Sequence, residues 1–482
     1  MFENKKIFIL GMARSGYEAA KLLAKRGNTI TLNDMSIDQD LDKVKELESL
    51  GVSVILGSHP DDILTPDFDY LIKNPGIRND HKYVLYANKH HIPVINEIEM
   101  AYHLLPKNVK IVGITGSNGK TSIKNILYEL IKDSYQTVIT PKNFNTPKGI
   151  KYTVCKLCKN TTQCIIFEMG ARRKNDILSL CKLTDVNMGI LSNIASQHIE
   201  TFKTIDNVFT TKCELPNYLK NQCCVFNFND IYSLRAYKQK SGEKLLIGIL
   251  DFYKTIKTKN IKLIKVIKKK TGIRKLKKIA LSAKKTCLIK FDLFAQKIKI
   301  KNGFTSFVLR YKNNVYSAET ILLGRHNISN ILQAMAIALS LKIDIKTLLH
   351  KVANLKPTQH RLELIRAKIN ILDDSYNCSI LSAKNSLEVL SQFPNTKICC
   401  TPGIIEGGKM QEELNIQLAN MLKQNSDIQI IVGKTNRIAF QKVLNKKSAS
   451  FVDTLDDAKK LFSIAKTGDT LLLLNDLPDD YN

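Results

Sequence analysis

The hydrophobic positions of the first hundred residues alternate between short apolar runs and longer segments with helical spacing. Ile7–Leu10 is an apolar run that leads into a glycine-containing turn, and Gly16–Arg26 places apolar residues three and four positions apart. Thr29–Leu32 is the next apolar run. A strand, a helix and a strand in this order predict a βαβ unit and therefore a parallel sheet. Further strands are predicted at Val52–Leu56, Tyr70–Ile72 and Val94–Ile95.

The alternation resumes after Pro106, where polar residues predict a linker. Val109–Ile114 is a predicted strand, and Ser122–Lys132 is a predicted helix. More strands of a parallel sheet are predicted at Cys164–Phe167, Met188–Leu191 and Cys223–Phe226. Lys297–Ser317 predicts hairpin strands, because Asn302-Gly303 and Asn313-Asn314 interrupt it with turn residues. A helix predicted at Ile328–Leu341 closes this part of the chain.

A third alternation starts near Leu355. Its predicted strands are Ile369–Leu372, Lys397–Cys400, Ile428–Val432 and Thr470–Leu474. Its predicted helices are Ser382–Ser391, Leu414–Gln424 and Thr454–Lys466. At 482 residues the chain exceeds the size at which one core stops growing. We therefore predict three consecutive α/β domains: a Rossmann-like domain (1–107), a P-loop ATPase-like domain with a parallel sheet and a small β part (108–354), and a Rossmann-like domain (355–482).

The charge balance is strongly basic, with 73 Lys and Arg against 44 Asp and Glu, a net charge of +29. Much of the excess lies between Lys254 and Lys285, where Lys alternates with Ile and Leu; a solvated face on an insertion is the simpler interpretation. Nucleic-acid binding is the alternative, but aromatic residues are sparse there, with Tyr253 and little else before Phe291. We expect no nucleic-acid partner. Attraction of small anions explains the charge equally well.

The eleven cysteines have scattered spacings, and the N-terminal apolar run is too short for a secretory signal or a membrane span. The cysteines are therefore expected to be reduced thiols of a cytoplasmic protein. Cys155 and Cys158 form one C-x-x-C pair, but no second pair has zinc-site spacing, so we expect no metal there.

One glycine-rich segment stands between a predicted strand and a predicted helix. It reads Gly113-Ile-Thr-Gly-Ser-Asn-Gly-Lys-Thr121, with glycines at 113, 116 and 119 rather than in the strict phosphate-loop pattern. Backbone N–H groups of such a loop, at a helix N-terminus, close around phosphate oxygens. The Lys120 ammonium would reach the β- and γ-phosphates, and the Thr121 hydroxyl would bind Mg²⁺. The predicted ATP-binding residues here are Thr115, Gly116, Ser117, Asn118, Gly119, Lys120, Thr121 and Ser122.

This T-G-S-N-G-K-T spelling resembles that of the Mur ligase family, whose members are ATP-dependent amide-forming enzymes of peptidoglycan precursor synthesis. The resemblance covers essentially the whole chain and implies three α/β domains, ATP and Mg²⁺. In IIFEMGARR, Glu168 stands at the family's carboxylate ligand for Mg²⁺. In SNIASQHIETF and TTKCEL, His198 matches the metal-binding His and Lys212 the carbamylated Lys. The implied metal ligands are Thr121, Glu168, His198 and Lys212 as its carbamate, which suit hard cations.

Two further motifs resemble family segments around the nucleotide. Gly324-Arg-His-Asn-Ile-Ser-Asn330 implies that Asn327 and Asn330 lie near the adenine, although helix capping by Asn is an open alternative. His360-Arg-Leu-Glu363 implies that Arg361 enters the phosphate site from the third domain, and the segment around Asp374 implies a carboxylate near the nucleotide. The implied catalytic residues are Lys120, Lys212, His198 and Arg361, with domain closure before chemistry.

The first hundred residues resemble the UDP-binding domain of the family's D-glutamate-adding member. Gly11-Met-Ala-Arg-Ser-Gly16 is followed by Asp34, and Lys73-Asn-Pro-Gly-Ile77 resembles an S-P-G-I loop with Asn74 in place of Ser. The resemblance implies that Asp34 contacts the uridine end and that Asn145 and Thr146 approach the sugar diphosphate. The implied UDP-substrate residues are Arg14, Ser15, Gly16, Asp34, Asn74, Gly76, Asn145 and Thr146.

From residue 143 onward, the spellings EMGARRKNDI, QHIETF, GRHN, DDSYN, TPGIIEGG and NDLPDDY resemble the D-Ala-D-Ala-adding member. Since the third domain of the family selects the amine, we expect a monomeric ligase that adds D-Ala-D-Ala to a UDP-N-acetylmuramoyl-peptide. Addition of D-glutamate is the first alternative, and an inactive nucleotide-binding homologue is the second. Cys378-Ser379-Ile380 and Gly407-Gly408-Lys409 depart from the family spellings and leave the choice of amine open.

Overall fold

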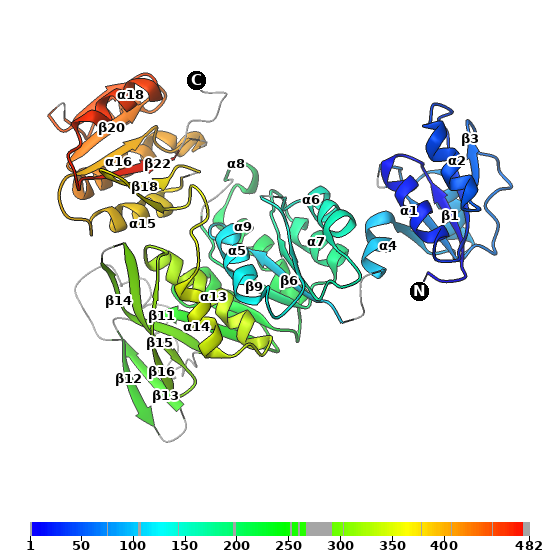
Figure 1. Cartoon of the computed structure of the whole chain (residues 1–482), viewed down its shortest axis with the longest axis horizontal. Coiled ribbons are helices and arrows are strands. Elements are labelled where there is room, and N and C mark those ends of the chain that lie inside the picture. Colours follow the sequence, from blue (N-terminus) through cyan, green and yellow to red (C-terminus); the bar gives the residue numbers. More distant parts are fainter. Residues whose placement is uncertain are drawn as a thin grey trace. The chain divides into compact units, whose positions relative to one another are not determined.

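The computed structural model describes residues 2–74, 76–104, 108–142, 144–195, 199–250, 253–258, 261–266, 292–301, 303–376, 378–405, 407–445 and 447–475. Its contacts divide the chain into two compact units (Figure 1). Unit 1 consists of residues 1–111, 144–165 and 179–185. Unit 2 consists of residues 112–143, 166–178 and 186–482. Unit 1 is therefore assembled from three separate pieces of the chain.

Unit 1 contains a five-stranded sheet, drawn in blue in Figure 1, with the order β3-β2-β1-β4-β5 and parallel pairing throughout. Its elements are β1 (Lys6–Leu10), α1 (Arg14–Ala24), β2 (Thr29–Asp34), α2 (Leu41–Ser49), β3 (Ser53–Leu56), β4 (Tyr70–Lys73), α3 (Lys82–Lys89), β5 (Val94–Asn96), α4 (Glu97–His103), α6 (Pro147–Tyr152) and a π-helical turn (Thr153–Leu157). The predicted parallel sheet is confirmed.

Strand β1 is buried on both faces of this sheet. Ile7 and Ile9 belong to a core with residues of α1 and α2, whereas Phe8 and Leu10 pack with residues of α3. Successive side chains of a strand point to opposite faces, so helices cover both sides. This double cover explains why β1 is a continuous apolar run rather than an alternating one.

The largest sheet has nine strands in the order β16-β15-β14-β11-β10-β9-β6-β8-β7. Its strands are β6 (Lys110–Thr115), β7 (Thr137–Ile139), β8 (Cys164–Glu168), β9 (Met188–Leu191), β10 (Cys224–Asn227), β11 (Lys244–Ile249), β14 (Leu293–Lys301), β15 (Phe304–Tyr311) and β16 (Asn314–Thr320). The accompanying helices are α5 (Lys120–Ile131), α7 (Asp176–Thr184), α8 (Ile199–Phe202), α9 (Ile205–Lys212), α10 (Glu214–Tyr218), α11 (Ile231–Gln239), α13 (Arg325–Ser340) and α14 (Ile345–Ala353).

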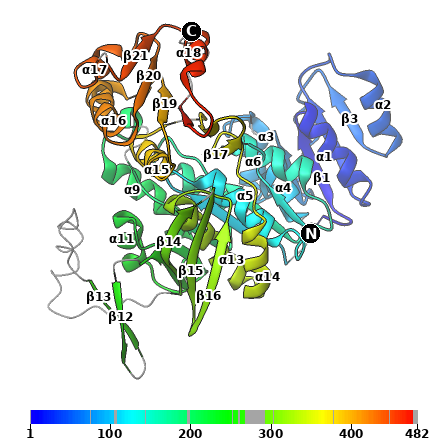
Figure 2. The ribbon, with the colours of Figure 1, turned by 60° about the vertical axis from the view of Figure 1, so that its left-hand side comes forward.

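The pairing in this sheet changes from parallel to antiparallel at β14. The strand pairs parallel with β11 but antiparallel with β15, which in turn pairs antiparallel with β16 (Figure 2). The tight connections after Lys301 and Tyr311 fall at the two predicted turns. The predicted combination of a parallel sheet with a small β part is thereby confirmed. Helix α13 packs against α5 and against β10, β11 and β14, so that twelve of its residues are buried.

The Lys-rich segment is described only in part. Backbone strands β12 (Tyr253–Thr258) and β13 (Ile261–Val266) form an antiparallel pair. Residues 267–291 lie outside the described ranges, and so do Asn302 and the C-terminal spelling from residue 476 onward.

The third sheet has the order β17-β18-β22-β19-β20-β21 and is parallel except for the antiparallel edge pair β17–β18. Its elements are β17 (Glu363–Arg366), β18 (Asn370–Asp374), α15 (Ile380–Leu390), β19 (Lys397–Thr401), a 3₁₀ turn (Gly408–Met410), α16 (Gln411–Asn425), β20 (Ile428–Val432), α17 (Arg437–Gln441), β21 (Ala449–Val452), α18 (Leu455–Leu461), a second 3₁₀ turn (Phe462–Ile464) and β22 (Thr470–Leu474). Alternate residues of β19 face two separate cores, which contain Cys399 on one side and Ile398 with Cys400 on the other.

The fold class is therefore mixed α/β with three sheets that are mainly parallel, as predicted. The boundaries proposed at residues 107 and 354 stay predictions. No helix within the described ranges is both long and apolar enough to cross a membrane.

Candidate functional site

The turn between β6 and α5 approaches its neighbours too closely for side chains at two glycines. Gly116 has φ of 140°, and a Cβ there would lie 2.0 Å from Oγ of Ser192. Gly119 has φ of 84°, and a Cβ there would lie 2.8 Å from Oδ1 of Asn330. Gly119 is also the N-cap residue of α5, so the helix N-terminus follows directly from the loop. This strand–loop–helix geometry is the one that binds phosphate groups.

Asn193, in the segment after β9, fixes the first half of this loop. Its carbonyl accepts the Ser117 N–H at 2.7 Å, and its Oδ1 accepts the Asn118 N–H at 2.8 Å. The Ser117 hydroxyl also donates to the Ala195 carbonyl at 3.0 Å, while Thr115 Oγ1 donates to the buried Met169 carbonyl. Sequence reasoning missed Asn193. Thr115 and Ser117 were predicted as ATP-binding residues, and their side chains serve to hold the loop.

Lys120 lies at the start of α5 with its ammonium turned into the loop. Its Nζ donates to the carbonyls of Gly116 at 3.0 Å and Ser117 at 2.8 Å. Loss of water around the ammonium lowers the pKa of Lys120, Glu168 raises it and Arg361 lowers it. A cation is therefore held inside the loop, where it would meet phosphate oxygens.

Thr121 and Glu168 meet at the base of the loop. The Thr121 hydroxyl donates to Oε2 of Glu168 at 2.9 Å, and Glu168 is 2% exposed at the end of β8. A hydroxyl and a carboxylate are hard oxygen ligands that fit Mg²⁺, which commonly takes one or two carboxylates together with substrate phosphates. Among the described residues no group of three or more His, Cys, Asp or Glu could hold a metal by itself. The site fits a cation that arrives with phosphates.

Lys124 is a second residue that sequence reasoning missed. It lies on α5 and is 1% exposed, and its Nζ is 3.5 Å from Oε2 of Glu168. Burial lowers the pKa of Lys124, and Glu168 partly offsets that effect. A Lys within a helix normally indicates a solvent-facing position, so only the fold reveals that this one faces the carboxylate.

Lys212 ends α9 and is 4% exposed. Its pKa is lowered to about 7, mainly by burial and also by the charge of Lys120, while the carboxylates of Asp176, Glu214 and Glu168 act in the opposite direction. A substantial fraction of this amine is therefore the free base near neutral pH. His198, its predicted companion at the metal, lies outside the described residues.

The two residues next to Arg361 have left-handed backbone conformations. His360 and Leu362, on either side of it, have φ of 59° and 53°, in the left-handed region that non-glycine residues rarely occupy. The guanidinium carbon lies 4.0 Å from the ring centroid of Tyr376. Burial lowers the pKa of Arg361, whereas Asp374, Tyr376 and Glu168 raise it. Arg361 therefore interacts electrostatically with Glu168 at the end of β8, and its entry into a phosphate site stays a prediction.

Asp374 ends β18 and accepts a short hydrogen bond from the Ser386 hydroxyl. Burial raises the pKa of its carboxyl, and Ser386 and Arg361 lower it. Asp374 is therefore grouped electrostatically with Arg361, and its place near the nucleotide stays a prediction.

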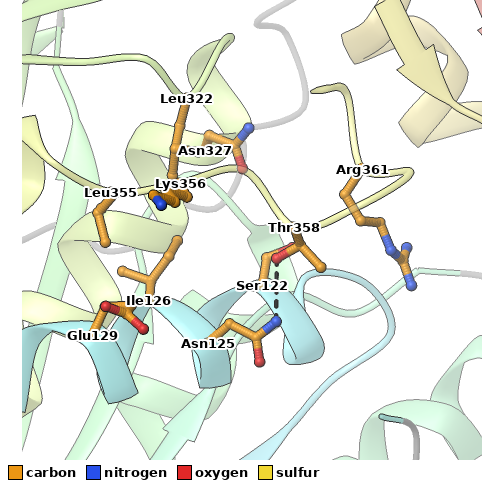
Figure 3. A pocket seen from close by; sticks show the side chains of 10 residues that line it. All are labelled: Ser122, Asn125, Ile126, Glu129, Leu322, Asn327, Leu355, Lys356, Thr358 and Arg361. Carbon is orange, nitrogen blue, oxygen red and sulfur yellow. Dashed lines mark hydrogen bonds between the residues drawn. The ribbon is translucent and has the colours of Figure 1, made fainter. Parts of the chain in front are cut away.

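A pocket beside α5 contains several of the predicted nucleotide residues (Figure 3). It encloses about 360 Å³, including space open to solvent, and it is lined by Ser122, Asn125, Ile126, Glu129, Leu322, Asn327, Leu355, Lys356, Thr358 and Arg361. In Figure 3 the α5 side chains face the segment that follows α14, and Asn125 Nδ2 donates to Thr358 Oγ1 at 3.2 Å. Asn327 donates to the Leu323 carbonyl, and Asn330 lies against Gly119.

A second cluster lies in unit 1, at the carboxyl ends of β1, β4 and β5. The Ser15 hydroxyl donates to Oε1 of Glu97 at 2.9 Å and accepts from Nδ2 of Asn74 at 3.2 Å. The Gly76 N–H donates to Oδ1 of Asn74, and a Cβ at Gly16 would lie 1.9 Å from the Gly11 carbonyl oxygen. Because β2 and β4 flank β1, this is the point where the strand order reverses and where α/β sheets bind ligands.

Asp34 closes the loop after β1 by accepting the Met12 N–H at 2.6 Å and the Ser36 N–H at 2.8 Å. Arg14 begins α1, and its side chain is outside the described set. Glu97 is 2% exposed, and its Oε2 is 4.0 Å from Nζ of Lys151 on α6.

Two other predicted substrate residues, Asn145 and Thr146, immediately precede α6. Asn145 is half-buried and Thr146 is exposed. Like α6 itself, both belong to unit 1.

Comparison with known proteins agrees with this geometry. Residues 114–279 match the family model described as "Mur ligase middle domain". The chain is 26% identical to a UDP-N-acetylmuramoylalanine--D-glutamate ligase of Geobacillus sp. (strain WCH70), over 98% of this chain and 92% of the relative.

Two solved structures share the fold. MurF from Acinetobacter baumannii has a TM-score of 0.64 and 17% identity, covering 94% of this chain and 88% of that one. MurF ligase from Thermotoga maritima in complex with ADP has a TM-score of 0.64 and 20% identity, covering 93% and 91%. The matched family model begins at Ile114, in the strand that leads into the phosphate loop, and it extends over both Glu168 and Lys212. Residues 114–279 thus match the middle domain of the Mur ligase family, and nearly the whole chain is similar to a UDP-N-acetylmuramoylalanine--D-glutamate ligase.

Proposed function

We propose that this chain is an ATP-dependent ligase of peptidoglycan precursor synthesis that joins D-Ala-D-Ala to the terminal carboxylate of a UDP-N-acetylmuramoyl-peptide. The observation that carries the proposal is the arrangement around the N-terminus of α5. There Lys120, Thr121, Glu168 and Arg361 bring three kinds of phosphate- and metal-binding group to one loop.

The reaction has two chemical steps. The peptide carboxylate attacks the γ-phosphorus of ATP, so that an acyl phosphate forms and ADP leaves. The amine of the dipeptide then attacks the acyl carbon, an amide bond forms, and inorganic phosphate leaves with the electron pair of the broken C–O bond. Lys120 and Arg361 stabilise the charge on the transferred phosphoryl group, which is the main contribution a protein makes to such a transfer.

Mg²⁺ would be held by the Thr121 hydroxyl and the Glu168 carboxylate, where it supplies charge neutralisation for the phosphates. Lys212 as a carbamate would add anionic oxygens to the same region. Burial supports this assignment, because a pKa of about 7 leaves the amine free to react with CO₂. His198 is proposed as a further ligand from the family resemblance alone.

The uridine diphosphate end of the substrate is assigned to the cluster in unit 1. Backbone N–H groups of the loop after β1 and the polar side chains of Ser15 and Asn74 suit a diphosphate and a sugar. Asp34 is proposed to contact the uridine, and Asn145 with Thr146 to approach the sugar diphosphate.

D-glutamate is the second candidate amine. It is favoured by the curated relatives, which are named D-glutamate ligases and match 98% of this chain. D-Ala-D-Ala is favoured by the spellings of the central and third parts, including GRHN at Gly324–Asn327 and TPGIIEGG at Thr401–Gly408.

Phosphate release distinguishes the two. The purified chain is supplied with ATP and Mg²⁺ and with each amine paired with its own acceptor: UDP-N-acetylmuramoyl-tripeptide for D-Ala-D-Ala and UDP-N-acetylmuramoyl-L-alanine for D-glutamate. We expect amine-dependent phosphate release with D-Ala-D-Ala. Phosphate release that depends only on D-glutamate would show that the amine donor is D-glutamate, while the proposed ligase activity would stand. If the protein binds ATP but releases no phosphate with either amine, an inactive homologue is favoured.

A further inference from the structure

Lys124 is part of the Glu168 site rather than of the helix surface. It follows Thr121 by one turn of α5, and both side chains reach Oε2 of Glu168, Thr121 at 2.9 Å and Lys124 at 3.5 Å. Lys124 and Glu168 are 1% and 2% exposed. A buried ion pair of this kind costs desolvation energy, which implies a role other than stability alone.

The ammonium of Lys124 is fixed in place by two additional acceptors. Its Nζ donates to the Thr140 carbonyl at 2.7 Å and to the Lys142 carbonyl at 2.6 Å. An ammonium has three N–H groups, so these two carbonyls and Glu168 use all of them. The Thr140 hydroxyl in turn accepts the Glu168 N–H at 3.0 Å. These contacts anchor the Lys124 ammonium beside Glu168.

Several positively charged side chains interact with this carboxylate. Lys120 and Arg361 both interact electrostatically with Glu168, as Lys124 does, and Asp374 is the carboxylate next to Arg361. A divalent cation at Glu168 would lie beside the fixed Lys124 charge in a site shielded from water, where repulsion is strong. The oxygens of a bound triphosphate would add negative charge that offsets this repulsion.

We propose that Lys124 is an internal counterion of Glu168 that excludes divalent cations from the site until a nucleotide brings its phosphates. The inference rests on the proposed role of Glu168 as a cation ligand. It makes Lys124 a positioning residue that couples metal binding to nucleotide binding. Neutralising Lys124 frees Oε2 for a metal and weakens this coupling.

The test uses Mn²⁺ as the probe, with bound and free Mn²⁺ measured by electron paramagnetic resonance on the full chain. Titrations are run with and without a non-hydrolysable ATP analogue. In the wild type we expect weak Mn²⁺ binding alone and much tighter binding with the analogue. In Lys124→Met we expect Mn²⁺ binding without nucleotide to tighten by about tenfold or more, because a neighbouring charge is lost. Lys346→Met, an exposed residue on α14, controls for the loss of one positive charge and should match the wild type.

Lys124→Met also leaves two carbonyls without their donor, so thermal unfolding is measured in parallel. Lys124→Gln keeps an N–H donor without the charge, and it decides the question if the Met variant does not fold. Nucleotide-free Mn²⁺ affinity that stays at the wild-type value in a folded neutral variant would overturn the inference. The wild type alone can also overturn it, by binding Mn²⁺ equally well with and without the nucleotide analogue.

Glu168→Gln separates this inference from the proposed function. If that variant binds Mn²⁺ and the nucleotide analogue as the wild type does, Glu168 is not a metal ligand and the assigned metal site is wrong. If Glu168→Gln loses metal binding while neutral Lys124 variants gain none, the metal site stands and only the counterion role is refuted.

Discussion

Asn330 occupies the space that a side chain at Gly119 would need: a Cβ at residue 119 would lie 2.8 Å from Oδ1 of Asn330. Gly119 also has φ of 84°, a conformation that L side chains rarely adopt. The N-cap residue of α5 is thus restricted to glycine by a neighbour on α13, far away in the sequence.

Gly119→Ala should therefore distort the loop and weaken ATP binding by about tenfold or more, since the left-handed backbone alone costs about 1–3 kcal/mol for such a residue. Binding of a non-hydrolysable ATP analogue is measured by calorimetry. Gly27→Ala is the matched control, because Gly27 has a similar φ of 78° but only ordinary contact, 3.5 Å from Asn4 Oδ1. Equal nucleotide affinity in the two variants would argue against Gly113–Thr121 as the phosphate loop.

Lys120→Ala should abolish ligation and leave the fold intact. Among the residues that the structure describes, the ammonium donates to two loop carbonyls, so we expect the free energy of unfolding to change by less than about 1 kcal/mol. Turnover should fall by at least about 100-fold, because a cation aimed at the transferred phosphoryl group is lost. Phosphate release and thermal unfolding are compared with those of Lys346→Ala. Near-wild-type turnover of Lys120→Ala would exclude this loop from catalysis.

Lys212 should make stability depend on pH in buffer freed of CO₂. Its folded-state pKa of about 7 is below the ordinary value of 10.5, so between these values the unfolded chain binds one more proton than the folded one. The free energy of unfolding should thus rise with pH above about 7, by up to about 1.4 kcal/mol per pH unit. Below about pH 7 both states are protonated, and the cost of the buried charge is fully present. Lys212→Met should lack this contribution, which denaturant unfolding at pH 7 and pH 8.5 measures.

The carbamate assignment has its own test. Lys212→Ala should lose activity, and a small carboxylic acid in excess should partly restore it by occupying the vacated volume. Lys212→Arg keeps a positive charge that cannot be carbamylated, so it should be inactive and should not respond to the acid. An active Lys212→Arg enzyme would show that the residue is structural.

The third sheet is expected to select the amine. Replacing the corresponding part of a D-glutamate-adding ligase by residues 355–482 should transfer preference for D-Ala-D-Ala, as measured by amine-dependent phosphate release. The reciprocal exchange of residues 1–107 should leave the preference unchanged. Preference that follows residues 1–107 would contradict the choice of D-Ala-D-Ala.

Much of this fold could be predicted because its strands are continuous apolar runs between helices. β1 has this character because helices cover both of its faces, and the glycine-rich spelling revealed the loop that begins α5. The reversal of strand order at β1 could not be read in the same way, because hydrophobic periodicity does not specify which strands are neighbours. Short helices such as α6 and α10 were also missed, since so few residues show no clear period.

The site was predicted where a motif is local and missed where it depends on tertiary contact. Lys124 was predicted simply as part of a helix, and β7, α6 and a π-helical turn separate it in sequence from its partner Glu168 at the end of β8. Asn193 acts through its backbone carbonyl and its amide, and neither leaves a distinctive spelling. Glu168 itself was found only through the family resemblance.

The discontinuous make-up of unit 1 has a consequence for synthesis on the ribosome. The five-stranded sheet is complete once β5 has emerged, but Lys151, the cation next to the buried Glu97, is translated only after β6, α5 and β7. The nascent sheet therefore exists for a time with a carboxylate whose counter-charge has not yet been made. A polypeptide ending near residue 107 would always lack the counter-charge of Glu97, because Lys151 belongs to the later piece of unit 1 at residues 144–165.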